Sequence, residues 1–366
     1  MMDVRWRHTH LDRRVASVTE VAHDSIGLYV SPPVSHLELA ARVPGYRPTD
    51  LDLLLSKRDL VGLRCLRGSA FLMPADLLAV VVPATRERNA RAFAAYLERS
   101  LVDGYEPWVE RILGVLGSGE ALTAREITER LQPAEGDRPF IATIVSQMAT
   151  ESHLIGVRVQ ASWRSARIEY TRWSDWLPNV DVESPDPEEA RDELARLYLG
   201  SFGPASVVDF AWWSGLTKTQ ARSAIGRSGA DPVDGLFDLD PVAVDPPPGG
   251  VRLLPIWDTL FVTWKDRSRF IPEALLPYVY DADGNATSVV LVDGEVAGVW
   301  GMNSDDTQLE VRAAPFGRFS TKQWAAIEKE ATVVGGLAGS ESVTLVRVDA
   351  PPNLREGKRN LFMRPV

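Results

Sequence analysis

Four side chains between positions 24 and 38 could act on a water molecule. Asp24, His36 and Glu38 are residue types that accept a proton as general bases, and the Ser31 hydroxyl can hold a water by hydrogen bonding. Each base also has a structural interpretation: a helix or turn cap for Asp24, a solvated helix face for Glu38 and a place at the start of a helix for His36. We favour the structural interpretation of each, because the sequence contains no sign that these side chains face a substrate.

Basic side chains gather in three segments and one lies beside a predicted turn, and such clusters are typical of proteins that bind phosphate groups. Each cluster could also pair with neighbouring acids or simply solvate a surface. The candidates are Arg158, Arg164, Arg167 and Arg172 around Trp163, then Lys218, Arg222 and Arg227, then Lys265, Arg267 and Arg269, and Arg67 beside the turn residue Gly68. Together they predict a surface that contacts the backbone of duplex DNA.

The sequence shows no other catalytic grouping. The five histidines are scattered, and the single cysteine, Cys65, lies in an apolar run typical of a buried, inert thiol. A glycine-rich phosphate loop and a serine-nucleophile arrangement are both missing. We therefore expect neither a metal nor a cofactor.

Length and charge limit the class of protein. A chain of 366 residues predicts two or three domains, and its 45% hydrophobic and 25% charged residues are typical of a globular protein. The net charge of -10 argues against a uniformly basic nucleic-acid coat. Acids are concentrated in "DVESPDPEEARDE" and "ADPVDGLFDLD", however, and this segregation permits a localised basic face.

We expect a cytoplasmic protein that does not enter membranes. Charged residues interrupt any apolar run at the start of the sequence, so no secretion signal is predicted. The longest apolar stretch, residues 77–82, is closed by Pro83 and is too short to span a bilayer. We expect the chain to be a monomer.

The middle of the chain has the pattern of a winged helix-turn-helix. Helical periodicity covers residues 108–116 and 140–148. Between these two segments, Thr123 and Glu126 have the spacing of a capping box at the start of a further helix. The alternating segment "LIGVRVQASWRSARIEYTRW" then predicts a hairpin that turns at Trp163. Three short helices followed by a hairpin make a winged module.

Other segments repeat this arrangement in outline. Thr49 is predicted to cap a helix that ends near Leu55, and a hairpin broken at Gly68 follows it. Further on, Thr217 is predicted to cap the second helix of another helical pair. The adjacent Trp212 and Trp213 are predicted to pack in the core rather than wedge into DNA.

The C-terminal part is richer in strand. Asp293 and Gly294 form a two-residue hairpin signal, and Ser320 is positioned to cap a helix. We predict an α+β fold, predominantly helical, of three tandem winged helix-turn-helix modules with a C-terminal strand-rich element. The modules are expected at residues 1–105, 106–180 and 181–366, the last of them including that element.

Four segments in this order resemble the AlkZ-like, or YcaQ-type, winged-helix DNA glycosylases. They are "LVGLRCLRGSAFLMPAD", "SFGPASVVDFAWWSGLTKTQAR", "LLPIWDTLFVTWKDRSRF" and "LVDGEVAGVWG", and they extend over most of the chain. The resemblance implies three winged helices around a positive channel that holds duplex DNA. It also implies hydrolysis of the N-glycosidic bond of an alkylated purine.

The resemblance also implies a Gln-x-Gln or Gln-x-Asp pair just before the helix at residues 37–43. Aligned on Gly27, those positions hold Tyr29 and Ser31, and aligned without a gap on the following helix they hold Leu28 and Val30. Neither alignment supplies a glutamine, and none precedes Gln132. An N7-alkylated purine already carries positive charge and leaves readily, so the task of the enzyme is to hold a water and stabilise charge on the sugar. Tyr29 and Ser31 supply hydroxyls without charge. Ser31 and Asp24 are therefore the surrogates that we consider for that task.

These observations leave three hypotheses. The first is a DNA-binding protein with little sequence preference that lacks the usual base-excision chemistry of the family. The second is a glycosylase that removes N7-alkylated or bulky purine adducts with a water held by a group other than glutamine. The third is a protein-interaction scaffold, which the acidic composition favours. The expected partner is duplex DNA, damaged or intact.

Overall fold

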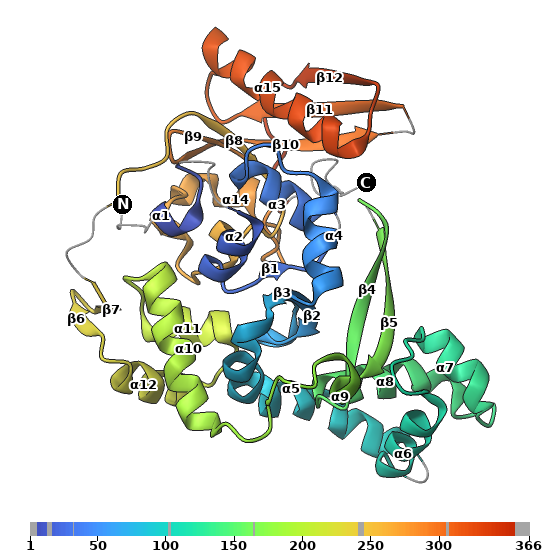
Figure 1. The fold of residues 1–366 in the computed structure, drawn as a ribbon. Helices are drawn as coiled ribbons and strands as arrows, with labels where there is room; N and C mark the ends of the chain where they lie inside the picture. The colour runs from blue at the N-terminus through green and yellow to red at the C-terminus, as the bar shows by residue number, and fades with distance from the viewer. Residues whose placement is uncertain are drawn as a thin grey trace. The chain divides into compact units, whose positions relative to one another are not determined.

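The computed structural model describes residues 6–12, 17–31, 33–101, 104–163, 165–240, 245–304 and 307–355 (Figure 1). The chain divides into two compact units that are both discontinuous in sequence. Unit 1 contains Met1–Leu53, Leu199–Ala205 and Asp231–Val366, and unit 2 contains Leu54–Tyr198 and Ser206–Ala230. The predicted division into three modules stays a prediction, because the units group residues by contact whereas a module is defined by its topology.

Helices and strands are mixed in a winged-helix architecture, as predicted from the sequence. The middle of unit 2 has the complete order of a winged helix-turn-helix, with three helices and a long antiparallel hairpin. The elements are α6 (Glu106–Val115), α7 (Ala124–Leu131), α8 (Ile141–Thr150), β4 (Leu154–Ser162) and β5 (Ser165–Arg172). The predicted capping box is confirmed, since Thr123 accepts from the Glu126 amide at 3.2 Å and Glu126 accepts from the Thr123 amide at 2.8 Å.

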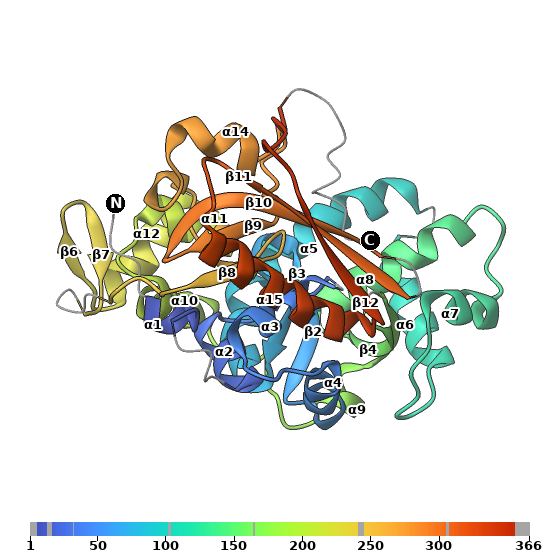
Figure 2. The ribbon, with the colours of Figure 1, turned by 90° about the horizontal axis from the view of Figure 1, so that it is seen from above.

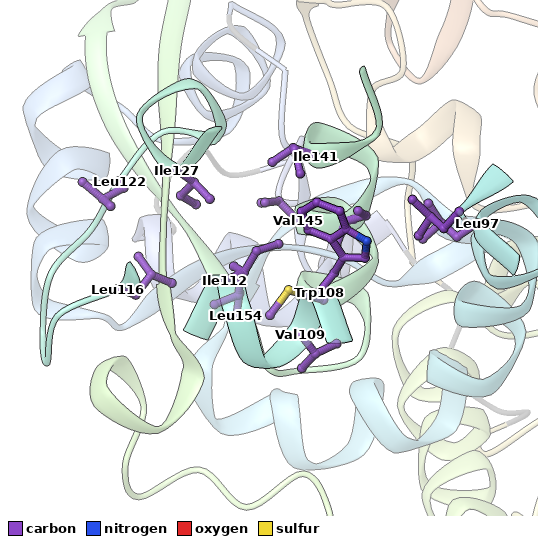
Figure 3. Close-up of a cluster of buried hydrophobic side chains, with 13 residues drawn as sticks. Leu97, Trp108, Val109, Ile112, Leu116, Leu122, Ile127, Ile141, Val145 and Leu154 are labelled. Atoms are coloured by element: carbon purple, nitrogen blue, oxygen red, sulfur yellow. The ribbon is translucent and has the colours of Figure 1, made fainter. Parts of the chain in front are cut away.

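A single apolar cluster holds this module together (Figure 3). Trp108 and Ile112 from α6, Ile127 from α7 and Ile144 from α8 are all buried in it. Trp108 and Ile112 lie four residues apart in α6, and Ile144 lies three residues after the buried Ile141 of α8, so each pair is on one helix face. Burying each of these side chains contributes roughly 1.5–3 kcal/mol.

The rest of unit 2 contains a second hairpin and a pair of helices. The predicted hairpin around Gly68 is confirmed, with Leu60 paired to Pro74 and Arg64 to Ala70. The predicted cap at Thr217 is also confirmed, since its side chain accepts from the Gln220 amide. The elements are β2 (Leu60–Arg64), η1 (Leu66–Gly68), β3 (Ala70–Pro74), η2 (Ala75–Leu77), α5 (Leu78–Ser100), η3 (Arg138–Phe140), α9 (Trp173–Trp176), α10 (Pro187–Phe202), whose end lies in unit 1, α11 (Val207–Ser214) and α12 (Lys218–Arg227).

Unit 1 is built on a five-stranded sheet in the order β12-β11-β10-β9-β8. The predicted turn at Asp293 and Gly294 is confirmed, because it joins the antiparallel β9 and β10. Strands β11 and β12 are parallel, so the chain crosses over between them through α15, which packs along the sheet (Figure 2). The elements are β8 (Val251–Leu254), β9 (Val289–Val292), β10 (Glu295–Ser304), β11 (Gln308–Pro315), α15 (Thr321–Ala338) and β12 (Ser342–Arg347).

The N-terminal helices of unit 1 position the candidate catalytic segment. Ser320 caps α15 as predicted, but Thr49 does not cap α4, because that helix already begins at Pro48 and Asp50 accepts from the Arg47 amide instead. None of the described helices has the length and apolar composition needed to cross a bilayer. The remaining elements are α1 (Trp6–Thr9), α2 (Val18–Asp24), β1 (Leu28–Tyr29), α3 (Val34–Arg42), α4 (Pro48–Lys57), which continues into unit 2, β6 (Asp231–Val233), β7 (Leu236–Asp238), α13 (Thr259–Val262), η4 (Arg267–Arg269), η5 (Glu273–Leu275) and α14 (Leu276–Val279).

Candidate catalytic segment and nucleic-acid interface

The segment between α2 and α3 contains the two positions at which the resemblance would place glutamines. A tight turn with positive φ at Ile26 (49°) and Gly27 (90°) leads into β1. Tyr29 is half-buried, and its ring centroid lies 5.2 Å from that of Trp257. Ser31 is also half-buried, and its carbonyl accepts from the Ser35 amide at the start of α3. The segment therefore presents an aromatic pair and a hydroxyl, without a carboxamide or a charge.

Asp24, the surrogate base considered from the sequence, lies at the end of α2 and contacts two imidazoles. Its Oδ2 is 2.8 Å from His10 Nε2 and 3.4 Å from His8 Nδ1. Burial alone would raise the pKa of Asp24, but the hydrogen bonds from His10 and His8 outweigh burial and hold that pKa well below its usual range. Asp24 therefore orients imidazoles and is not the helix or turn cap that we expected. Its low pKa also makes it a weak proton acceptor.

Glu38 is completely buried, which contradicts the prediction of a solvated helix face. Its Oε1 accepts from the Thr259 hydroxyl at 2.5 Å and from the Thr259 amide at 3.2 Å, whereas its Oε2 has no hydrogen-bond partner within the described residues. The prediction was wrong because every residue of α3 is buried, so this helix has no solvent-exposed face. Burial, and then repulsion from Asp258, raises the pKa of Glu38 to about 7.

Arg42 supplies the positive charge of this buried cluster. Its guanidinium donates to both carboxylate oxygens of Asp258, at 2.8 and 2.7 Å, and its Nε donates to the Thr9 carbonyl at 2.9 Å. The contacts of Arg42, Asp258 and Glu38 join α3 to the start of α13. His36, the third base considered from the sequence, is buried with its Nδ1 2.6 Å from the Tyr46 hydroxyl.

Two basic residues of α12 extend into solvent. Lys218 and Arg222 are exposed, lie four residues apart on one helix face and make no ion pair within the described ranges. Arg227 on the same helix is exposed as well, but it pairs with Asp192 at 2.6 Å and with Glu188 at 3.6 Å. Of the three candidates on this helix, Lys218 and Arg222 are therefore the better placed for a phosphate group.

The candidates on the long hairpin have mostly intramolecular partners. Arg172 donates to the carbonyls of Leu113 and Leu116, at 2.6 and 3.0 Å, and so ties the hairpin to α6 and the residue that follows it. Arg167 pairs with Glu169. Arg164 and the side chain of Arg158 lie outside the described residues.

The "WKDRSR" candidates divide between surface and interior. Lys265 is exposed. Arg267 lies over the Tyr280 ring, 3.7 Å from its centroid, and donates to the Gly284 carbonyl. Arg269 is buried and lies 5.3 Å from the Trp264 ring centroid, so its guanidinium faces the interior.

Arg67 marks a place where the β2–β3 hairpin meets the turn between α11 and α12. Its guanidinium lies 4.0 Å from the ring centroid of Trp212, and a Cβ placed on Gly215 would lie 3.0 Å from the Arg67 Cα and 2.8 Å from an Arg88 nitrogen. Trp213 is buried against Tyr198 and Phe210, which confirms the prediction of core packing for this residue.

We give the name basic junction to five basic residues of unit 2, namely Arg64 and Arg67 on the β2–β3 hairpin, Arg88 on α5, and Lys218 and Arg222 on α12. Arg64 and Arg88 are exposed, and neither makes an ion pair within the parts of the chain that the structure describes. The sequence patterns did not single out these two arginines, because only folding brings the hairpin and α5 to the turn before α12. The junction thus adds several exposed cations to unit 2.

Comparison with known proteins identifies the family. The family described as DNA glycosylase AlkZ-like matches residues 18–336. The chain belongs to this AlkZ-like family. An interstrand DNA cross-link repair glycosylase of Streptomyces sahachiroi is 26% identical over 256 residues, which are 63% of this chain and 65% of that protein. The match therefore spans slightly less than two thirds of that relative.

A solved structure shares the AlkZ-like fold. The Streptomyces sahachiroi DNA glycosylase AlkZ superimposes with a TM-score of 0.73 at 20% identity, covering 95% of this chain and 100% of that one. The likeness confirms the fold predicted from the four sequence segments. At this identity the roles of individual side chains must come from the present structure.

Proposed function

We propose that this AlkZ-like chain binds duplex DNA with little sequence preference and lacks the glutamine-dependent base excision implied by the family resemblance. The observation that carries the proposal is the basic junction. Arg64, Arg88, Lys218 and Arg222 are exposed and unpaired within the described residues, whereas Arg227 nearby is neutralised by acids. Contacts to phosphate hold a duplex without reading its bases, so little sequence preference follows.

The loss of glutamine chemistry rests on Tyr29 and Ser31. A glutamine amide both donates to and accepts from a water, and a carboxylate in the second position would add negative charge beside the sugar. Tyr29 and Ser31 offer hydroxyls only. The Tyr29 ring packs against Trp257 in a tilted arrangement, with the ring centroids 5.2 Å apart, so we assign it to an aromatic wall rather than to a water-holding pair.

A second candidate function is excision of N7-alkylated or bulky purines by a different proton acceptor. The observation that favours it is the pair of imidazoles on Asp24, since His10 and Asp24 have the contact of a base and its orienting carboxylate. The general base would then be His10, which lies in a different segment from Tyr29 and Ser31.

DNA binding is tested by fluorescence anisotropy of the intact chain with short labelled duplexes of two unrelated sequences. We expect equal affinities and a steep loss of affinity with salt, because binding releases the counterions of the duplex. Lys218→Ala and Arg222→Ala should each reduce the slope of log affinity against log salt by about one. Arg227→Ala is the matched control on the same helix and should leave the slope unchanged.

Two results would count against this assignment. An Arg227→Ala effect as large as that of Arg222→Ala would remove the basic junction as the contact surface. No binding of either duplex at low salt would favour the third hypothesis, a protein-interaction scaffold.

The second function is tested by a single-turnover reaction with protein in excess over a duplex that contains 7-methylguanine. Base release is scored by alkaline strand cleavage at the abasic product. Release faster than the protein-free control establishes excision. No release while the duplex is bound leaves a DNA-binding protein without this chemistry.

A further inference from the structure

We infer that His10 is the general base for the attacking water and that Asp24 is the positioning residue that orients its imidazole. This inference rests on the second function proposed above, base excision. It assigns the chemistry to a residue that the sequence patterns did not single out and that lies outside the Tyr29 and Ser31 positions.

The geometry of the contact supports this division of roles. His10 Nε2 lies 2.8 Å from Asp24 Oδ2, so the carboxylate fixes the ring and its tautomer. The other ring nitrogen, Nδ1, has no hydrogen bond to any residue that the structure describes. The His10 side chain is 16% exposed and that of Asp24 is 36% exposed, so a water can reach the imidazole.

Asp24 itself is poorly suited to accept the proton. The two imidazoles stabilise its ionised form and hold its pKa well below the usual range, so the carboxylate takes up a proton only with difficulty. His8 lies 3.4 Å from the same oxygen and adds to this effect, and Glu20 is a further charged group near His10. An imidazole oriented by a carboxylate is the more effective base.

The backbone around His10 is strained and held from both sides. His10 has a φ of +55°, in the left-handed region. On one side Thr9 accepts from Arg42 through its carbonyl and donates through its hydroxyl to the Trp6 carbonyl, and on the other Leu11 is completely buried. Strain that neighbouring contacts maintain is concentrated at functional sites in proteins.

Asp24 lies close in sequence to the segment that the resemblance marks as catalytic. Hydrogen bonds from the Ile26 amide to the His23 carbonyl and from the Gly27 amide to the Ala22 carbonyl close the turn that follows it. The carboxylate is therefore fixed one tight turn before Tyr29. The residues described include no cluster of three or more ligands suited to a metal ion, so the three side chains are not interpreted as a metal site.

In the proposed step, the oxygen of a water attacks C1′ of the deoxyribose and the bond from C1′ to N9 of the purine breaks. The bonding electron pair goes to N9, and the water proton goes to His10 Nδ1. The products are the free base and an abasic sugar with a hydroxyl on C1′. An N7-alkylated purine leaves as a neutral molecule, so no general acid is needed.

The test compares the wild type with His10→Asn and Asp24→Asn in the single-turnover reaction on the 7-methylguanine duplex. Asparagine tolerates a left-handed backbone, so His10→Asn keeps the turn and removes the base. We expect a rate loss of roughly 100-fold for His10→Asn and a smaller one for Asp24→Asn, with duplex affinity unchanged in both. His153→Asn removes an exposed histidine of unit 2 that lies 3.8 Å from Glu151, and it should have the wild-type rate.

The pH profile separates a base from a merely structural residue. The wild-type rate should have an acid limb in its pH profile, and His10→Asn should lose this limb. A His10→Asn variant with the wild-type rate and acid limb would overturn the assignment while leaving excision intact. A wild type that binds the duplex without releasing the base would overturn excision itself, and the assignment of His10 with it.

Discussion

Arg42 and Asp258 form a two-bond ion pair in which both side chains are almost completely buried. Each partner has further bonds, since Arg42 donates to the Thr9 and Glu38 carbonyls and Asp258 accepts from the Leu260 amide. A buried charge without its partner pays a large desolvation penalty, so the two residues depend on each other. The pair joins the helix after the candidate catalytic segment to the residue that follows Trp257.

Arg42→Met should destabilise the protein by about 3–5 kcal/mol, because it leaves the Asp258 carboxylate buried and unpaired. The double variant Arg42→Met with Asp258→Asn should recover part of this loss, since an amide has no charge to compensate. Urea unfolding followed by circular dichroism measures both free energies. A loss below about 1 kcal/mol for the single variant would show that Asp258 finds water or another partner.

The stability of the protein should fall as pH rises through the interval in which Glu38 loses its proton. Its ordinary pKa is 4.5, and burial followed by repulsion from Asp258 raises it to about 7 in the folded state. Between these values the folded state keeps a proton that the unfolded state has released, so the free energy of unfolding decreases with rising pH and levels off above about 7.

Glu38→Gln should remove this component, because the amide is neutral at every pH. The measurement is the free energy of unfolding at several pH values for both proteins, and the slope attributable to Glu38 is at most about 1.4 kcal/mol per pH unit. Equal slopes for the two proteins would mean that Glu38 is ionised in the fold, with Arg42 as its effective partner.

Gly215→Ala should destabilise unit 2 by roughly 1–3 kcal/mol. Gly215 has a φ of +82°, and the added Cβ would lie 3.0 Å from the Arg67 Cα and 2.8 Å from an Arg88 nitrogen. Gly226→Ala is the matched control in α12, where nothing lies within 4 Å, and it should stabilise by about 0.5–1 kcal/mol. Thermal unfolding of both variants checks the prediction, and a neutral Gly215→Ala would show that the hairpin tip can move away.

The Cys65 thiol should not react with a thiol reagent in the native protein. Burial raises the pKa of Cys65 to about 12, so almost no thiolate exists at neutral pH, and the side chain is 1% exposed. The same reagent should label the thiol fully in urea. Fast labelling without denaturant would mean that the β2–β3 hairpin opens frequently.

Local signals in the sequence predicted local structure well. Thr123, Thr217 and Ser320 all cap helices as expected, and the hairpin turn at Asp293 and Gly294 is where the dipeptide predicts it. These features depend on residues three or four positions apart. Pro83, by contrast, lies in the second turn of the long helix α5, which the sequence patterns did not predict because proline is unfavourable inside a helix.

The candidate site was harder to predict because its contacts join distant residues. His10 becomes a candidate base only through its contact with Asp24, which lies fourteen residues later in the sequence. Glu38 was expected on a solvated face, but the whole of α3 is buried and Glu38 is hydrogen-bonded to Thr259, which lies 221 residues later in the chain. Arg88 joins the basic junction only because α5 passes the turn at Gly215.

Unit 1 combines segments from before and after unit 2 in the sequence, and this arrangement favours an order of assembly. Arg42 lies 216 residues before Asp258, so on the ribosome α3 must wait for its ion-pair partner while all of unit 2 is synthesised. Unit 2 is complete at Ala230 and can fold first, as domains do during synthesis. Until Asp258 emerges, Arg42 has no ion-pair partner and α3 cannot be held in place. Unit 2 can therefore form before the candidate catalytic segment.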